Sequence, residues 1–191
     1  LDRREMVRET AGIGYCNTKA TLFIALLRAA GIEARQQFAD LDAALLRGLL
    51  DLRTPFVDHS YTEVLLDGVW VPTDSYVVDK ALFRAAQAAL RIEGQRFGYG
   101  VRVDGRSEWD GRAPSFAQFV PDDPACSRHH WGVFPDVTAF YESTSSCWNR
   151  RDEVMRVVFP LAALTANQTA DALRRHGPTP GPRTGRARQR P

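Results

Sequence analysis

Two runs of β-branched and aromatic residues, separated by Asp67-Gly68, constrain the fold of this chain more than any other feature. The runs are 59–66, with the sequence HSYTEVLL, and 69–76, with the sequence VWVPTDSY. Asp-Gly is a preferred pair for a two-residue hairpin turn because both turn positions require a positive φ. Pro72 has no backbone N–H to donate, so its strand is expected at the edge of a sheet. The segment therefore predicts an antiparallel hairpin with an edge strand.

A two-residue turn also fixes which residues face each other. Leu65 then faces Trp70, and Tyr61 faces Asp74. Because facing residues share a side and side chains alternate along a strand, His59 and Asp74 are diagonal neighbours about 7 Å apart at the backbone. At that distance a carboxylate reaches an imidazole, fixes its tautomer and stabilises its cation. The hairpin thus predicts a His-Asp pair on one face of the sheet.

Apolar residues at helical spacing over 17–30 predict a helix that ends at Gly31 and is buried around most of its circumference. An extended segment is expected over 32–38. An amphipathic helix over 79–92 has Asp79 as its N-cap and Gly94 as its stop. Further elements are predicted as helices over 41–52, 152–159 and 167–176 and a strand over 97–103. The fold class indicated is α+β, and residues 106–150 give no clear pattern.

Cys16 lies at the start of the helix predicted over 17–30. The free N–H groups and the dipole of a helix N-terminus favour a thiolate, which is the nucleophilic form of cysteine. The alternative interpretation is a small buried hydrophobic residue, which is the commoner role of an isolated cysteine. The chain has three cysteines, which cannot all pair within it, so a reducing, cytoplasmic location is expected.

Several phrases then occur in a characteristic order between residues 9 and 79. They are Gly14-Tyr-Cys16, Ala25 to Arg35 (ALLRAAGIEAR), His59 to Val64 (HSYTEV), Asp67 to Trp70 (DGVW), and Asp74. Together they resemble the core of the transglutaminase-like superfamily, of bacterial type. The resemblance implies a papain-like α+β fold in which a buried helix carrying the cysteine packs on an antiparallel sheet carrying the histidine and the aspartate.

By this resemblance Cys16 is the nucleophile, His59 the general base and acid, and Asp74 the residue that orients His59. The implied activity is acyl transfer from an amide of a protein or peptide substrate, through a thioester and without a cofactor or metal. Water as the second nucleophile gives proteolysis or deamidation, and an amine gives crosslinking; the sequence leaves both open. The alternative is a catalytically inactive transglutaminase-like interaction module.

Two features depart from the family pattern. Tyr61 stands where the family usually has a tryptophan. The family also places a helix and an oxyanion-stabilising side chain before the cysteine, whereas here 15 residues precede Cys16. Three explanations stay open: an upstream segment outside this chain, an oxyanion held by the backbone N–H of Cys16 and another group, or impaired catalysis. Losing one oxyanion donor costs about 10²–10³ in rate.

The net charge of +2 is unevenly distributed along the chain. Residues 1–173 carry 19 basic and 23 acidic side chains, and residues 174–191 carry six arginines. The sequence predicts one folded domain over 1–176, with core motifs over 9–79 and a C-terminal elaboration over 80–176. The Arg/Pro/Gly-rich tail over 177–191 is predicted to be disordered. It has no aromatic residue to stack on bases, so a specific nucleic-acid partner is not expected, although nonspecific contact through its arginines stays a weaker alternative.

Two other classes of function find little support in the sequence. The longest apolar stretch, 20–27, is far shorter than the roughly 20 residues that cross a bilayer, so no membrane partner is expected. Cys126, His129, His130 and Cys147 are metal-ligating residue types, but their spacing is not that of a standard zinc site. They are interpreted as polar loop residues, and no metal is expected.

Overall fold

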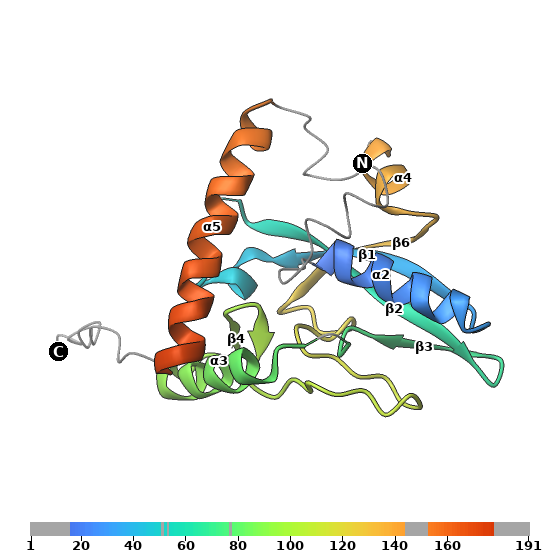
Figure 1. Ribbon diagram of the computed structural model, residues 1–191, viewed down its shortest axis with the longest axis horizontal. Helices are drawn as coiled ribbons and strands as arrows, with labels where there is room; N and C mark the ends of the chain where they lie inside the picture. The colour runs from blue at the N-terminus through green and yellow to red at the C-terminus, as the bar shows by residue number, and fades with distance from the viewer. Residues whose placement is uncertain (1–15, 51, 53, 77, 144–152, 178–191) are drawn as a thin grey trace, which may run out of the picture.

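A four-stranded antiparallel sheet forms the centre of the protein, in the order β3-β2-β1-β6 (Figure 1). This computed structural model describes residues 16–50, 52, 54–76, 78–143 and 153–177, and within α5 it describes side chains from residue 164 onward. The strands are β1 (Ala34–Asp42), β2 (Phe56–Leu66), β3 (Val69–Thr73), β4 (Phe97–Gly98), β5 (Val101–Arg102) and β6 (Ser127–Phe134). The helices are α2 (Cys16–Ala29), the 3-10 turn η1 (Ala43–Leu46), α3 (Lys80–Glu93), α4 (Val137–Glu142) and α5 (Glu153–His176). The mixture of helices and antiparallel strands agrees with the α+β prediction.

The hairpin of β2 and β3 has the predicted turn and register. Asp67 and Gly68 have φ values of 49° and 80°, which a two-residue turn of this kind requires. Thr73 pairs with Thr62, and β3 lies at the edge of the sheet, as Pro72 indicated. The predicted boundaries were wrong at two ends, because β2 begins earlier, at Phe56, and β3 ends at Thr73. Residues 74–76 therefore continue beyond the strand rather than within it.

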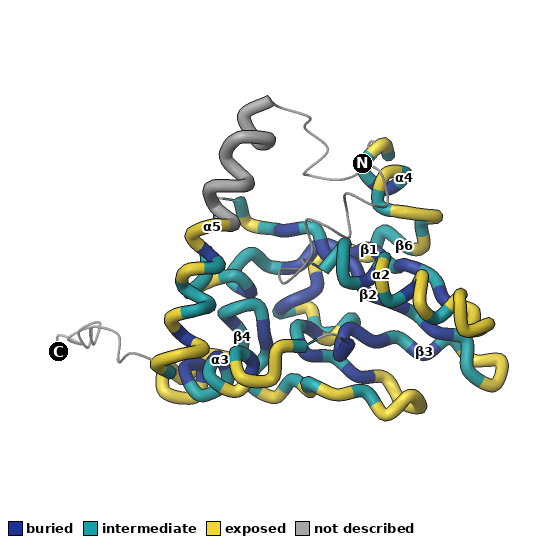
Figure 2. The backbone as a smooth tube through the Cα atoms, in the orientation of Figure 1, coloured by how far each residue is buried: buried dark blue, intermediate teal, exposed yellow. Residues whose placement is uncertain are grey.

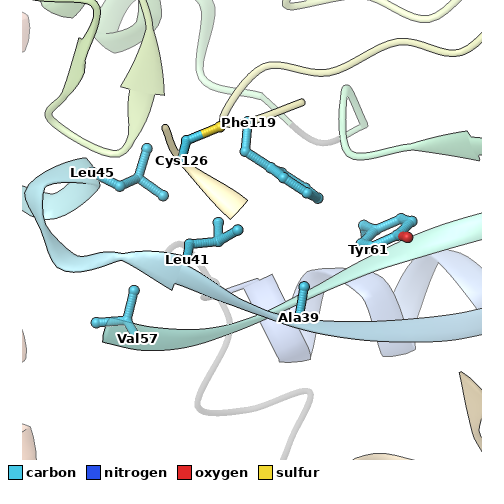
Figure 3. Close-up of a cluster of buried hydrophobic side chains, with 7 residues drawn as sticks. All are labelled: Ala39, Leu41, Leu45, Val57, Tyr61, Phe119 and Cys126. Carbon is cyan, nitrogen blue, oxygen red and sulfur yellow. The ribbon is translucent and has the colours of Figure 1, made fainter. Parts of the chain in front are cut away.

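The two faces of the sheet are covered differently. On one face Ala39, Leu41 and Tyr61 point toward Phe119 and Cys126, and this cluster is the main core (Figure 3). Helix α2 packs on β1 and β2 from the other face and buries Ala20 and Ile24 (Figure 1). Side chains at alternate positions of β2 consequently reach two separate environments.

The prediction that the first helix is buried around most of its circumference was wrong. Leu22 is 43% exposed and Leu26 is 59% exposed, and exposed positions follow α2 toward its C-terminal end (Figure 2). A helix that packs on a sheet from one side buries one stripe of its surface. Part of the apolar surface of α2, including Leu22 and Leu26, is therefore left exposed.

Two predicted elements take other forms because tertiary packing overrides local pattern. Instead of a helix over 41–52, β1 continues to Asp42 and is followed by η1. Leu41 pairs with Val57 in the sheet and is fully buried there. Instead of one strand over 97–103, β4 and β5 form a small hairpin that turns at Tyr99 and Gly100, both with positive φ.

The C-terminal half confirms one helix and corrects two. Helix α3 has Asp79 as its N-cap and Gly94 in the left-handed conformation at its end, as predicted. The two helices predicted over 152–159 and 167–176 form one helix, α5, which continues through Pro160. Proline removes one backbone donor, and the helix tolerates that loss here. β6 and α4 lie within residues 106–150, for which no element was predicted, and the predicted disordered tail beyond Gly177 lies outside the described residues. None of the described helices combines the length and apolar character needed to cross a membrane.

Asp79 joins two helices, which leads to a stability prediction. Its Oδ1 accepts a hydrogen bond of 2.9 Å from the Leu82 N–H, and its Oδ2 lies 2.7 Å from Arg174 Nη2 of α5. Asp79→Ala is expected to lower the free energy of unfolding by about 1–2 kcal/mol, mainly through loss of the cap. Asp79→Asn keeps a capping oxygen and loses only an exposed ion pair, so its loss should be smaller. Urea unfolding measures both, and equal losses would contradict the capping role.

Candidate active site

Cys16 is the first residue of α2 and lies at an open edge of the sheet. Because β3 ends at Thr73, opposite Thr62, residues 56–61 of β2 have no strand partner on that side within the described ranges. The backbone N–H of Ser60 in this segment lies near the Cys16 sulfur and favours its thiolate form. Cys16 Sγ also lies 3.8 Å from Asn17 Oδ1. The early end of β3 thus leaves room for the helix N-terminus to approach β2.

His59 and Asp74 form a buried pair, as the hairpin register predicted. His59 Nε2 lies 3.9 Å from Asp74 Oδ2, and the two side chains are 4% and 2% exposed. The imidazole packs edge-on against the Phe119 ring, with 4.8 Å between ring centroids. His59 Nε2 has no hydrogen-bond partner among the described residues. Shortening this distance by about 0.7 Å would bring the pair into direct hydrogen-bond range.

The Asp74 carboxylate is held by a segment that the sequence analysis could not assign. Oδ1 accepts a hydrogen bond from the Ala117 N–H, and Oδ2 accepts one of 3.2 Å from the Gln118 N–H. The preceding residue, Thr73, is anchored to the Ser115 carbonyl by its side chain. These two backbone bonds orient the carboxylate toward His59, and the nearby Lys19 ammonium also favours its charged form. Backbone donors carry no residue-type signal, so a sequence pattern does not reveal them.

The structure brings His59 and Asp74 together, and it places Cys16 beside Ser60, the residue that follows His59. Cys16 Sγ makes no hydrogen bond to the imidazole in this state. Nε2 is the ring nitrogen that lies near Asp74. Catalytic hydrogen bonds are often long in free enzymes and shorten when the substrate binds.

Burial favours the uncharged forms of all three groups. It raises the pKa of the Cys16 thiol to about 11, with a further increase from the Asp58 carboxylate. Burial lowers the pKa of His59 to about 3 and raises the pKa of Asp74 to about 7. The expectation that the helix N-terminus makes Cys16 a thiolate was therefore wrong for the resting state. Desolvation outweighs the backbone N–H groups of Ser60 and Asn17, so at neutral pH Cys16 is a thiol and His59 a neutral imidazole.

A second polar network, which the sequence analysis missed, lies on the other side of Cys16. Asn17 Nδ2 lies 2.9 Å from Tyr141 Oη and 3.5 Å from Asp58 Oδ2, and the Tyr141 hydroxyl donates to Asp58. Burial raises the pKa of Asp58, and these two donors partly oppose that increase. Asp58 directly precedes the predicted strand, so its charge next to His59 was a visible signal. Nothing in the sequence placed Tyr141 here.

The charge of Asp58 gives a prediction for Cys16. Asp58→Asn should lower the apparent pKa of Cys16, because the carboxylate disfavours the thiolate. Iodoacetamide alkylation of Cys16, followed by mass spectrometry from pH 7 to 11, should then be several-fold faster at pH 8 in the variant. Asp42→Asn, on the neighbouring strand, is the control. An unchanged Cys16 profile in Asp58→Asn would show that the carboxylate does not act on the sulfur.

The four residues weighed as zinc ligands do not gather into one site in the described part of the chain. Cys126 is buried, and its Sγ lies 3.5 Å from the Asp123 carbonyl. His130 Nε2 lies 2.8 Å from Ser127 Oγ, and the His129 ring packs against Trp131. Cys147 lies outside the described residues. The described residues contain no group of three or more His, Cys, Asp or Glu side chains that could hold a metal ion.

Comparison with known proteins identifies the segment that carries these residues. Residues 3–75 match the family model described as the transglutaminase-like superfamily. The match includes the positions of Cys16, His59 and Asp74 and ends one residue after Asp74. No curated protein and no solved structure matches the chain.

Proposed function

We propose, from the match of residues 3–75 to the family model described as the transglutaminase-like superfamily, that the protein is a cysteine-dependent enzyme that acts on amide bonds. Cys16 is the proposed nucleophile, His59 the general base and acid, and Asp74 the residue that orients His59. The single observation that most supports this assignment is the buried His59–Asp74 pair, at 3.9 Å, beside the strand residue that contacts Cys16. A buried imidazole with an oriented carboxylate is typical of such sites.

In the proposed reaction the Cys16 sulfur attacks the amide carbonyl carbon, and the thiol proton passes to His59. The tetrahedral intermediate collapses to a thioester, and His59 returns the proton to the departing amine or ammonia. Water or a second amine then attacks the thioester, with His59 accepting its proton, and releases Cys16. Water gives proteolysis or deamidation, and an amine gives transamidation.

The resting ionisation states affect when the proton moves. With the pKa of Cys16 raised to about 11 and that of His59 lowered to about 3, a preformed thiolate–imidazolium pair is disfavoured. Proton transfer from sulfur to imidazole therefore accompanies the attack on the carbonyl. Asp74 then matters most in the transition state, where its carboxylate stabilises the developing imidazolium.

The experiment that tests this proposal is direct detection of the acyl-enzyme. The protein is incubated with a mixture of unmodified peptides, quenched in acid, digested and analysed by mass spectrometry for acyl adducts on the Cys16 peptide. We expect an adduct that hydroxylamine removes as a hydroxamate, and that His59→Ala reduces strongly. Cys126 in the same digest is the internal control, and equal labelling of both thiols would contradict a catalytic role.

A second candidate function is a catalytically inactive interaction module with the same core. The observation that favours it is the raised pKa of Cys16, together with the missing hydrogen bond to His59. This alternative predicts that no peptide or glutamine amide acylates Cys16. It also predicts that Cys16→Ala leaves partner binding unchanged.

A further inference from the structure

Two aspartates face each other across the sheet on the side where α2 packs. Asp40 of β1 pairs directly with Asp58 of β2 in the antiparallel register. Directly opposed residues share a side and have Cβ atoms about 5 Å apart, and like charges in such a pair are destabilising. Asp58 meets Asn17 of α2, which shows that this side is the one the helix covers. The sheet therefore places two carboxylates together beside the start of α2.

No cation balances these carboxylates among the residues that the structure describes. Neither aspartate has a Lys, Arg or His nitrogen within ion-pair distance there, although other aspartates do, such as Asp42 with Arg128. Within the described part of the chain, the hydrogen bonds to the Asp58 side chain come from neutral donors, the Tyr141 hydroxyl and the Asn17 amide. Asp40 is 8% exposed, and its buried Oδ1 has no hydrogen-bond partner among the described residues. A buried carboxylate oxygen without a donor is costly, so a ligand that supplies charge and N–H donors would fit it.

This acidic pair lies next to the proposed nucleophile. The Asn17 side-chain amide contacts both groups: its Oδ1 lies 3.8 Å from Cys16 Sγ, and its Nδ2 lies 3.5 Å from Asp58 Oδ2. One amide group thus separates the sulfur from the Asp58 carboxylate. A cation bound at the aspartates would therefore lie on the Asn17 side of a carbonyl that Cys16 attacks.

We propose that Asp40 and Asp58 bind an alkylammonium group carried by the amide substrate of Cys16. The inference rests on the proposed function, because it names the substrate class of that site. An ammonium held between two carboxylates keeps its proton and has no lone pair, so it anchors the substrate and is not the attacking amine. Its charge also offsets that of Asp58, which otherwise raises the pKa of Cys16. Binding of a cationic substrate would therefore favour the thiolate form of Cys16, which attacks it.

Charge-selective labelling of Cys16 tests the site without a known substrate. The probes are 2-aminoethyl methanethiosulfonate, which is cationic, and the neutral ethyl analogue. In each case the Cys16 thiolate attacks the reagent's thiol sulfur, forms a disulfide and releases methanesulfinate. Rates are measured on the intact chain by mass spectrometry of the Cys16 peptide. We expect the cation-to-neutral rate ratio to exceed that of free 2-mercaptoethanol by about tenfold at low salt and less at high salt.

Three variants test whether the preference for the cationic reagent depends on Asp40 and Asp58. Asp58→Asn and Asp40→Asn should each bring the ratio close to the free-thiol value, whereas the control Asp42→Asn should keep it. The ratio does not depend on the thiolate fraction, because both reagents react with the same thiolate, so a shift in the pKa of Cys16 cancels. A wild-type ratio equal to that of the free thiol would overturn the proposal with no variant needed. A high ratio that persists in both variants would also overturn it.

Competition identifies the source of the ammonium. Nα-acetyl-lysine N-methylamide carries a side-chain ammonium, and alanine N-methylamide carries an α-ammonium. The compound that lowers the wild-type ratio identifies a lysine side chain or a free amino terminus as the recognised group, and no effect of either compound would contradict binding. Labelling requires no turnover. A charge preference without acyl-enzyme formation would therefore contradict the proposed function and support the ammonium site at Asp40 and Asp58. Acyl-enzyme formation without a charge preference would contradict the ammonium site alone.

Discussion

Cys16→Ala is expected to lower kcat/KM for amide turnover by about 10⁴-fold or more. Cys16 is the proposed nucleophile, and removing the nucleophile of a Cys-His-Asp enzyme removes its covalent pathway. The measurement is release of ammonia or amine from a peptide substrate found by acyl-enzyme trapping, at equal protein concentration and with folding checked by circular dichroism.

Cys126→Ala is the matched control for this prediction. Cys126 is buried in the core cluster that also contains Leu41, Leu45 and Phe119, and its sulfur faces the Asp123 carbonyl. Its replacement should cost some stability and leave kcat/KM within about twofold of wild type. Comparable activity of Cys16→Ala and the wild type would exclude Cys16 as the nucleophile.

His59 and Asp74 should impose opposite pH dependences on stability that nearly cancel in the wild type. The pKa of His59 is lowered from 6.5 to about 3, so below pH 6.5 the unfolded chain binds the extra proton and stability falls as pH falls. The pKa of Asp74 is raised from 3.8 to about 7, so between these values the folded chain binds the extra proton and stability falls as pH rises. From about pH 4 to 6.5 the pair carries one proton in either state, but on a different residue.

Single substitutions should reveal the two pH dependences of stability that cancel in the wild type. Asp74→Asn leaves the His59 dependence, so its free energy of unfolding should fall as the pH is lowered from 6.5 toward 4. His59→Gln leaves the Asp74 dependence, and its stability should fall as the pH is raised over the same range. Each slope approaches about 1.4 kcal/mol per pH unit, relative to the wild-type profile. Urea unfolding at half-unit pH steps measures them.

The control for these slopes is Asp67→Asn, which makes the same chemical change in the exposed hairpin turn. Its profile should follow that of the wild type. Parallel profiles for Asp74→Asn and His59→Gln would show that the pair does not store its proton on Asp74 in the folded state.

The sequence predicted the part of the site that depends on strand geometry. A two-residue Asp67-Gly68 turn determines the register, and the register brings His59 and Asp74 to one face. Local propensity likewise predicted the caps of α3, because Asp79 and Gly94 act on their own neighbours. Both cases involve residues close in sequence, where the covalent chain limits the possible arrangements.

Features that depend on distant segments could not be predicted in this way. The backbone donors that hold Asp74 come from residues 117 and 118, and Tyr141 reaches Asp58 from a helix that had no clear pattern. The pKa of Cys16 also depends on tertiary burial, which outweighs the local helix dipole. The first residues of the helix predicted over 41–52 belong to strand β1 instead, because Leu41 pairs with Val57 in the sheet. In each case packing between remote segments decided the outcome.

Two consecutive residues of β2 place their side chains in different surroundings. Asp58 and His59 are consecutive, so their side chains leave the strand in opposite directions, one toward Asn17 and Tyr141 and the other toward Asp74 and Phe119. Cys16, at the unpaired edge, belongs to neither face. The sheet therefore separates the Asp58 carboxylate from the His59–Asp74 pair, and the Cys16 thiol lies at its edge, where the charge of Asp58 raises the pKa of the sulfur.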